Sequence, residues 1–88
     1  MATTDLDRKT AEQALAVLDE LITYQKKKVL ALAQRIRPGL TDEDLRNVHD
    51  FPDVHGDPFF QFEDGQLSGF VAARVALKSR LVGGTLAR

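Results

Sequence analysis

The residues best suited to metal chemistry gather between positions 49 and 57. His49 and His55 alternate there with Asp50, Asp53 and Asp57. Imidazole nitrogens and carboxylate oxygens are the donors that hold zinc and other divalent cations. Their spacing, however, matches no zinc motif, and it misplaces the glycine and the final acid of an EF-hand loop. We therefore expect a solvated loop, with a metal site on His49, Asp53, His55 and Asp57 as the alternative.

No motif typical of a catalytic site accompanies this segment. The sequence has no glycine-rich phosphate loop, no nucleophile elbow and no cysteine. General acid or base work by the histidines would need a pocket that holds a substrate. We therefore expect a protein that is not an enzyme and uses no cofactor.

Composition indicates one small globular domain spanning residues 1–88. Hydrophobic residues make up 43% of the chain and charged residues 28%, which is typical of folded proteins. No apolar run reaches the roughly 18 residues that a membrane span requires, so we expect no membrane partner. The first residues also lack the basic-then-apolar order of a signal peptide, and we expect a cytoplasmic protein.

Charge and aromatic residues are concentrated in the middle of the sequence. Residues 41–64 carry eight acids and one base, and four of the five phenylalanines lie in the same stretch. We expect the phenylalanine rings to close one end of the core, because each ring buries a large apolar area. The alternative is a docking surface for an unknown protein partner, offering apolar anchors and negative charge together. Its candidate residues are Asp44, Phe51, Asp53, Phe59, Phe60 and Phe62.

The pattern before this segment predicts one long helix over residues 7–37. The stretch holds no glycine or proline until Pro38-Gly39, which cannot continue a helix. Its inward positions repeat with the 4,3 spacing of a heptad, which defines the first seam. The seam comprises Ala11, Leu15, Leu18, Ile22, Gln25, Val29, Leu32 and Ile36. Ala14 and Leu21 widen it beyond the contact area of a single partner helix.

The connection spans residues 38–63. Thr41 followed by three acids predicts the N-cap of a short helix that ends near Val48. Residues 49–58 hold two prolines and a glycine, so we expect a loop there. Asp57-Pro58 allows a turn of helix over residues 59–63, and an extended segment is the alternative.

A second helix is predicted over residues 64–82, with a frayed tail over 83–88. The fold class is therefore all-α, an antiparallel helical hairpin with a short helix in its connection. Pairing the two helices residue for residue places Arg74 opposite Gln25 to Val29. Gly69 lies in mid-helix at a cost of about 1 kcal/mol, which predicts a close neighbour, either the long helix or a partner subunit.

Two helices alone cannot enclose a core, so we expect a homodimer that forms a four-helix bundle. The function we expect is a non-enzymatic interaction or structural module. The basic half of the first helix allows weak nucleic-acid contact as an alternative, through Lys26, Lys27 and Lys28 together with Arg35 and Arg37. We do not expect such contact, because the three lysines point in different directions and no aromatic residues alternate with them.

Overall fold

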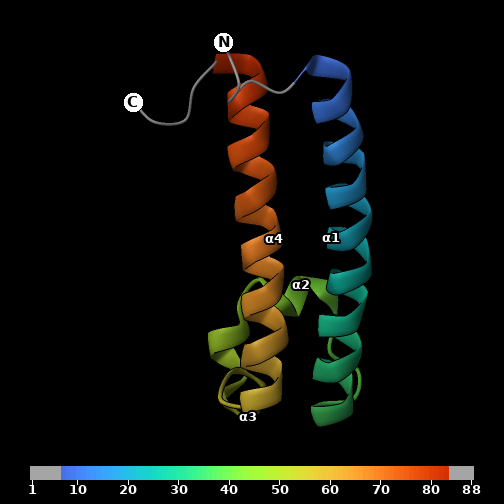
Figure 1. Cartoon of the computed structure of the whole chain (residues 1–88). Coiled ribbons are helices and arrows are strands. Elements are labelled where there is room, and N and C mark those ends of the chain that lie inside the picture. The colour runs from blue at the N-terminus through green and yellow to red at the C-terminus, as the bar shows by residue number, and fades with distance from the viewer. Residues whose placement is uncertain (1–6, 84–88) are drawn as a thin grey trace.

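The computed structural model describes residues 7–83, with side chains through residue 81. Helix α1 spans Arg8–Ile36 and α4 spans Pro58–Gly83. The connection between them holds α2 at Asp42–Leu45, a 3₁₀ helix η1 at Val48–Asp50 and α3 at Pro52–His55. Within residues 7–83 the structure has no strand. The two long helices run side by side and antiparallel, with the short helices near one end (Figure 1). The predicted all-α hairpin is confirmed.

Helix α1 begins and ends where the local sequence requires. Asp7 is its N-cap and accepts a hydrogen bond from the backbone N–H of Lys9 at 3.0 Å. Arg37 closes the other end by donating its backbone N–H to the carbonyl of Ala33 at 2.8 Å. Gly39 then turns the chain with a φ of 89°, in the left-handed region that glycine adopts without strain. The predicted first helix is therefore correct to within a residue at each end.

Helix α4 begins at Pro58, so the predicted start at residue 64 is wrong. A carboxylate oxygen of Asp57 accepts a hydrogen bond from the backbone N–H of Phe60 at 2.9 Å, and Pro58 supplies a preset first helical position. The cap-and-proline alternative is thus correct, and the turn it starts continues through Gly65 into the main helix. The predicted frayed tail begins at residue 83, which is the last residue of α4, and the remainder of that tail at 84–88 lies outside the described residues.

The segment over residues 49–58 is also more ordered than a loop. Helix α3 begins with Pro52, and the backbone N–H of Gly56 donates to the carbonyl of Pro52 at 2.9 Å. Val54 of α3 is fully buried. It belongs to a cluster of buried residues that closes this end of the hairpin, made of Val29, Ala33, Leu40, Val54 and Phe60. The connection is therefore a packed cap on the hairpin.

The register of the two long helices differs from the prediction. Arg74 forms an ion pair with Asp19, and Gln25 instead meets Glu63. The earlier start of α4 accounts for this change, because six added residues move every later position of α4 toward the beginning of α1. Gly69 has no atom within 4 Å of the point where a Cβ would lie. The expected close approach of the long helix to Gly69 is therefore wrong.

The hairpin is elongated, with principal extents of 52 × 24 × 19 Å and a radius of gyration of 16.4 Å. A compact domain of this length would have a radius of gyration of about 12 Å. No helix in the described part of the chain combines the length and apolarity needed to cross a membrane.

Candidate interaction surface

One flank of the hairpin carries a row of exposed residues, most of them apolar, which we call the open face. On α1 the row follows the 4,3 helical spacing that keeps residues on one stripe. On α4 it starts with two phenylalanines at the beginning of the helix. The open face comprises Val17, Leu21, Tyr24, Lys28, Ala31 and Arg35 of α1 with Phe59, Phe62, Gln66, Gly69 and Ala73 of α4.

The large side chains of this face are strongly exposed. Tyr24 is 65% exposed, Phe59 73% and Phe62 62%, with Val17 and Leu21 also exposed. Single exposed apolar residues are ordinary, so it is the alignment of several large ones on one flank that makes this face a candidate interaction surface.

A groove shows that the two helices contribute to the same face. It has a volume of about 530 Å³ and runs between α1 and the start of α4. The lining residues are Lys28, Ala31, Leu32, Arg35, Ile36, Phe59 and Glu63. Every one of them belongs to α1 or α4, so the short helices do not cover this flank.

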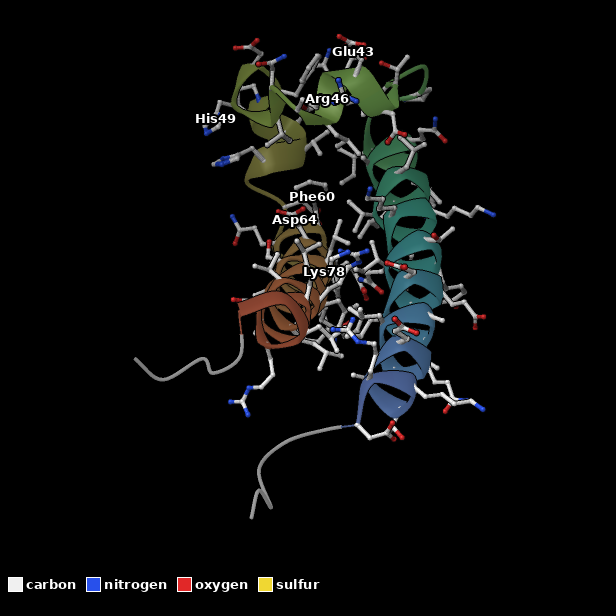
Figure 2. The ribbon with its side chains drawn as sticks, turned by 90° about the horizontal axis from the view of Figure 1, so that it is seen from above. Glu43, Arg46, His49, Phe60, Asp64 and Lys78 are labelled. Carbon is white, nitrogen blue, oxygen red and sulfur yellow. The ribbon has the colours of Figure 1, made fainter. Side chains whose placement is uncertain are left out.

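The opposite flank is the one that the connection covers. A smaller groove of about 250 Å³ lies there, and Asp42, Leu45 and Arg46 at α2 contribute to its lining together with α1 and α4. In Figure 2 the labelled Glu43, Arg46 and His49 project from the connection, which lies at one end of the two long helices. Leu45 and Val48 pack against the buried cluster there. At the end of the hairpin where the connection lies, one flank is therefore covered and the open face is not, whereas farther along α4 Val71 and Val75 are also exposed.

Between the flanks, a polar layer joins the two helices. The side-chain amide of Gln25 is only 3% exposed and donates at 2.8 Å to the backbone carbonyl and to a carboxylate oxygen of Glu63. The ammonium of Lys28 lies 3.5 Å from the same carboxylate. No buried side-chain nitrogen or oxygen in the described residues lacks a hydrogen-bond partner.

Two of the predicted interaction residues, Phe59 and Phe62, belong to the open face. Phe60 is 3% exposed and lies in the buried cluster, and Phe51 is half-buried. The expectation that the phenylalanines together close the core is therefore correct for Phe60 and wrong for Phe59 and Phe62.

The two predicted interaction acids serve the connection itself. Asp44 accepts a hydrogen bond from the backbone N–H of Thr41 at 2.9 Å, completing a capping box. Asp53 pairs with Arg37 at 3.3 Å, and the Arg37 guanidinium also stacks 5.1 Å from the centre of the Phe51 ring. Partial desolvation raises the pKa of the Asp53 carboxyl, but the hydrogen bond and charge of Arg37 outweigh it and leave that pKa below its ordinary value.

The candidate metal ligands are only partly brought together. The rings of His49 and His55 stack with centroids 5.1 Å apart and both are exposed. Asp53 is paired with Arg37, and Asp57 caps α4. Among residues 7–83, no group of three or more histidine, aspartate and glutamate side chains is placed to hold a metal ion.

The three consecutive lysines of α1 do not form one patch. Lys28 pairs with Glu63, Lys26 lines the groove on the covered flank, and Lys27 is exposed. This spread reflects the rotation of about 100° between adjacent helical positions.

Val17, Leu21 and Tyr24 were not among the predicted site residues. The available signal was a second row at positions 17, 21, 24, 28, 31 and 35, parallel to the first seam. Val17, Leu21 and Tyr24 are residue types that a core also contains, and their exposure in the structure is what shows that they lie outside it. Comparison of the chain with known protein families, with curated proteins and with solved structures found no match.

Proposed function

We propose that this protein is a non-enzymatic structural module that associates with a second copy of itself through the open face. One observation carries the proposal: large apolar side chains line the flank that the connection leaves uncovered. Two hairpins joined through such faces form a four-helix bundle, in which each stripe packs against a partner helix.

The elongated shape agrees with this proposal, because two helices lying side by side leave more of their apolar stripes in water than a compact domain of the same size does.

Light scattering of the purified chain tests the proposal directly, and we expect the mass of a dimer at micromolar concentration. Leu21→Glu places a charge on the open face at a residue that is already 41% exposed, so the fold should survive while association is lost. Thr23→Glu, at an exposed position off the face, is the matched control and should remain dimeric. A monomeric wild-type chain would refute the proposal.

A basic partner for residues 41–64 is a second candidate function. Asp42, Glu43 and Asp50 are exposed, and none of them forms an ion pair with another residue in the described part of the chain. Titration with a basic amphipathic peptide should then shift amide resonances of the connection at physiological salt. Shifts that vanish in 0.5 M salt and involve no apolar residue would indicate unspecific charge attraction instead.

A further inference from the structure

Four residues of α1 on the open face have the arrangement that receives a side chain from a facing helix. Lys28, Ala31, Leu32 and Arg35 stand at positions i, i+3, i+4 and i+7, and all four line the 530 Å³ groove. In helical bundles, a set of four residues with this spacing forms the hole into which one knob of the partner helix inserts. We call this set the α1 hole.

The chemistry of the α1 hole suits an aromatic ring. Ala31 leaves room above the helix backbone, and Leu32 is a half-buried apolar neighbour. Lys28 and Arg35 stand at the rim. Arg35 forms no hydrogen bond or ion pair with any other described residue, so its guanidinium is available to a ring face. Apolar walls with cations at the rim attract the negative face of an aromatic ring.

The open face of α4 carries such a ring at the same height along the hairpin. Phe62 is 62% exposed and is next to Glu63, whose carboxylate lies 3.5 Å from Lys28. Phe62 does not line the groove of its own chain, whose α4 edge is formed by Phe59 and Glu63. If equivalent residues of two copies lie at the same position along the helix axis, Phe62 of one copy faces the α1 hole of the other.

We propose that Phe62 of a second copy occupies the α1 hole, with the two copies related by a two-fold axis parallel to the long helices. This inference rests on the self-association proposed above and specifies its geometry. In this arrangement α1 of each copy faces α4 of the other. Equivalent residues of the two copies lie at the same position along the helix axis. The two holes of the dimer are then filled by two equivalent rings.

The rest of the face supports the parallel axis. Val17 and Leu21 on α1 then face the half of α4 that contains Gly69 and Ala73, so bulky side chains meet small ones. A two-fold axis perpendicular to the helices, placed at the middle of α1, would instead reverse the order of residues of the second copy along the helix axis. Because the midpoint of α1 is residue 22, the α1 hole would then face the stretch around Gln13 of the other copy, which has no aromatic side chain.

The chain has no cysteine, which permits cross-linking from single introduced sites. Gln66 lies about one helical turn beyond Phe62 and, by the register of Gln25 and Glu63, near the height of Tyr24. With the parallel axis, Gln66→Cys chains mixed with Tyr24→Cys chains should give a heterodimer with a short bifunctional maleimide. Gln66→Cys alone should cross-link poorly. With the perpendicular axis, two copies of Gln66 meet near the axis, and Gln66→Cys alone should cross-link efficiently.

Phe62→Ala and Arg35→Ala test the contact itself. Phe62→Ala should weaken the dimer about tenfold or more, as loss of a buried aromatic anchor does. Arg35→Ala should weaken it to a smaller extent, and Arg35→Lys should restore part of the loss. Val75→Ala is the control, since Val75 is 60% exposed but lies off the open face. Circular dichroism should show unchanged helicity in all four variants.

Light scattering, together with the cross-linking, distinguishes failure of the self-association from failure of the Phe62 contact. A wild-type monomer overturns both the self-association and the Phe62 contact. A wild-type dimer that cross-links through Gln66→Cys alone, or that tolerates Phe62→Ala, overturns the contact and leaves the self-association standing. A dimer with the Tyr24–Gln66 cross-link and the loss in Phe62→Ala supports both.

Discussion

Gln25 and Glu63 meet across the interface of the two long helices, where one amide donates both of its hydrogens to the same residue. The backbone carbonyl and the carboxylate of Glu63 each accept at 2.8 Å. Gln25 is the one polar residue in the first seam, and at 3% exposure it is desolvated. A buried polar pair of this kind sets the register of helices, because any shift would leave the amide unpaired.

The first prediction concerns this pair. Gln25→Leu should destabilise the chain by about 1–3 kcal/mol, because the Glu63 carboxylate loses its amide donor while remaining largely buried. Gln25→Leu combined with Glu63→Leu should recover most of that loss, since two apolar side chains then fill the layer. Urea unfolding at one fixed protein concentration measures both effects. A double variant that loses the sum of the two single losses would show that the pair is not coupled.

Helix α1 and the hairpin could be predicted because their signals are local and periodic. Every 4,3 position from Ala11 to Val29 is buried or half-buried in the structure, Gln25 included. The start of α4 could not be predicted in the same way. Phe59 and Phe62 are apolar but exposed, so they disturb the 3.6-residue pattern that would otherwise mark a helix from Pro58. The register error at Arg74 follows from that one missed boundary.

The open face could not be predicted from the sequence, for a related reason. An apolar residue that faces a partner and one that faces its own core have the same side chain. Tyr24 and Val29 both lie on rows with heptad spacing, yet Tyr24 is 65% exposed and Val29 only 2%. The packing of α4 against the first seam decides which row of α1 is covered, and residue spacing within α1 does not by itself specify which row α4 contacts.

The second prediction tests the first seam. Ile22 is 8% exposed, so Ile22→Asp places an unpaired carboxylate in the core and should cost at least about 3 kcal/mol. Thr23→Asp introduces the same side chain one position away on an exposed site and should change stability little. Thermal unfolding followed by circular dichroism compares the two. Equal effects of the two substitutions would mean that the seam is misplaced.

The third prediction concerns the ion pair of Asp19 and Arg74. Their side chains are 52% and 35% exposed, so solvent screens the attraction and the coupling should not exceed about 1 kcal/mol. A double-mutant cycle with Asp19→Asn and Arg74→Gln measures it, and the value should fall further in high salt. A coupling well above this limit that persists in salt would contradict the exposed geometry.

The fourth prediction is that the connection binds no zinc tightly. His49 and His55 lie close together, but Asp53 and Asp57 are engaged by Arg37 and by the start of α4. Calorimetric titration with zinc should therefore detect no micromolar site. Micromolar binding that disappears in the His49→Ala, His55→Ala double variant would overturn the prediction.

The last prediction concerns the pH dependence of the start of α1. The Thr10 hydroxyl donates to the Asp7 carboxylate, and the backbone N–H of Lys9 donates to its other oxygen at 3.0 Å. Both hydrogen bonds favour the ionised form and hold the pKa of Asp7 below its ordinary value of 3.8. Because the folded chain has the lower pKa, the ionised cap stabilises the helix above the pKa of the unfolded chain. That contribution is lost as the pH falls from about 4 through the folded pKa.

Asp7→Asn supplies the control, since asparagine also caps helices but does not titrate. The wild-type chain should therefore lose stability relative to Asp7→Asn as the pH falls below about 4, and the difference between them should be constant above pH 5. Thr10→Val removes the hydroxyl donor and should raise the pKa of Asp7 toward its ordinary value, measured by carboxyl carbon NMR. If the pKa of Asp7 is the same with and without the Thr10 hydroxyl, this hydrogen bond does not form part of the cap in solution.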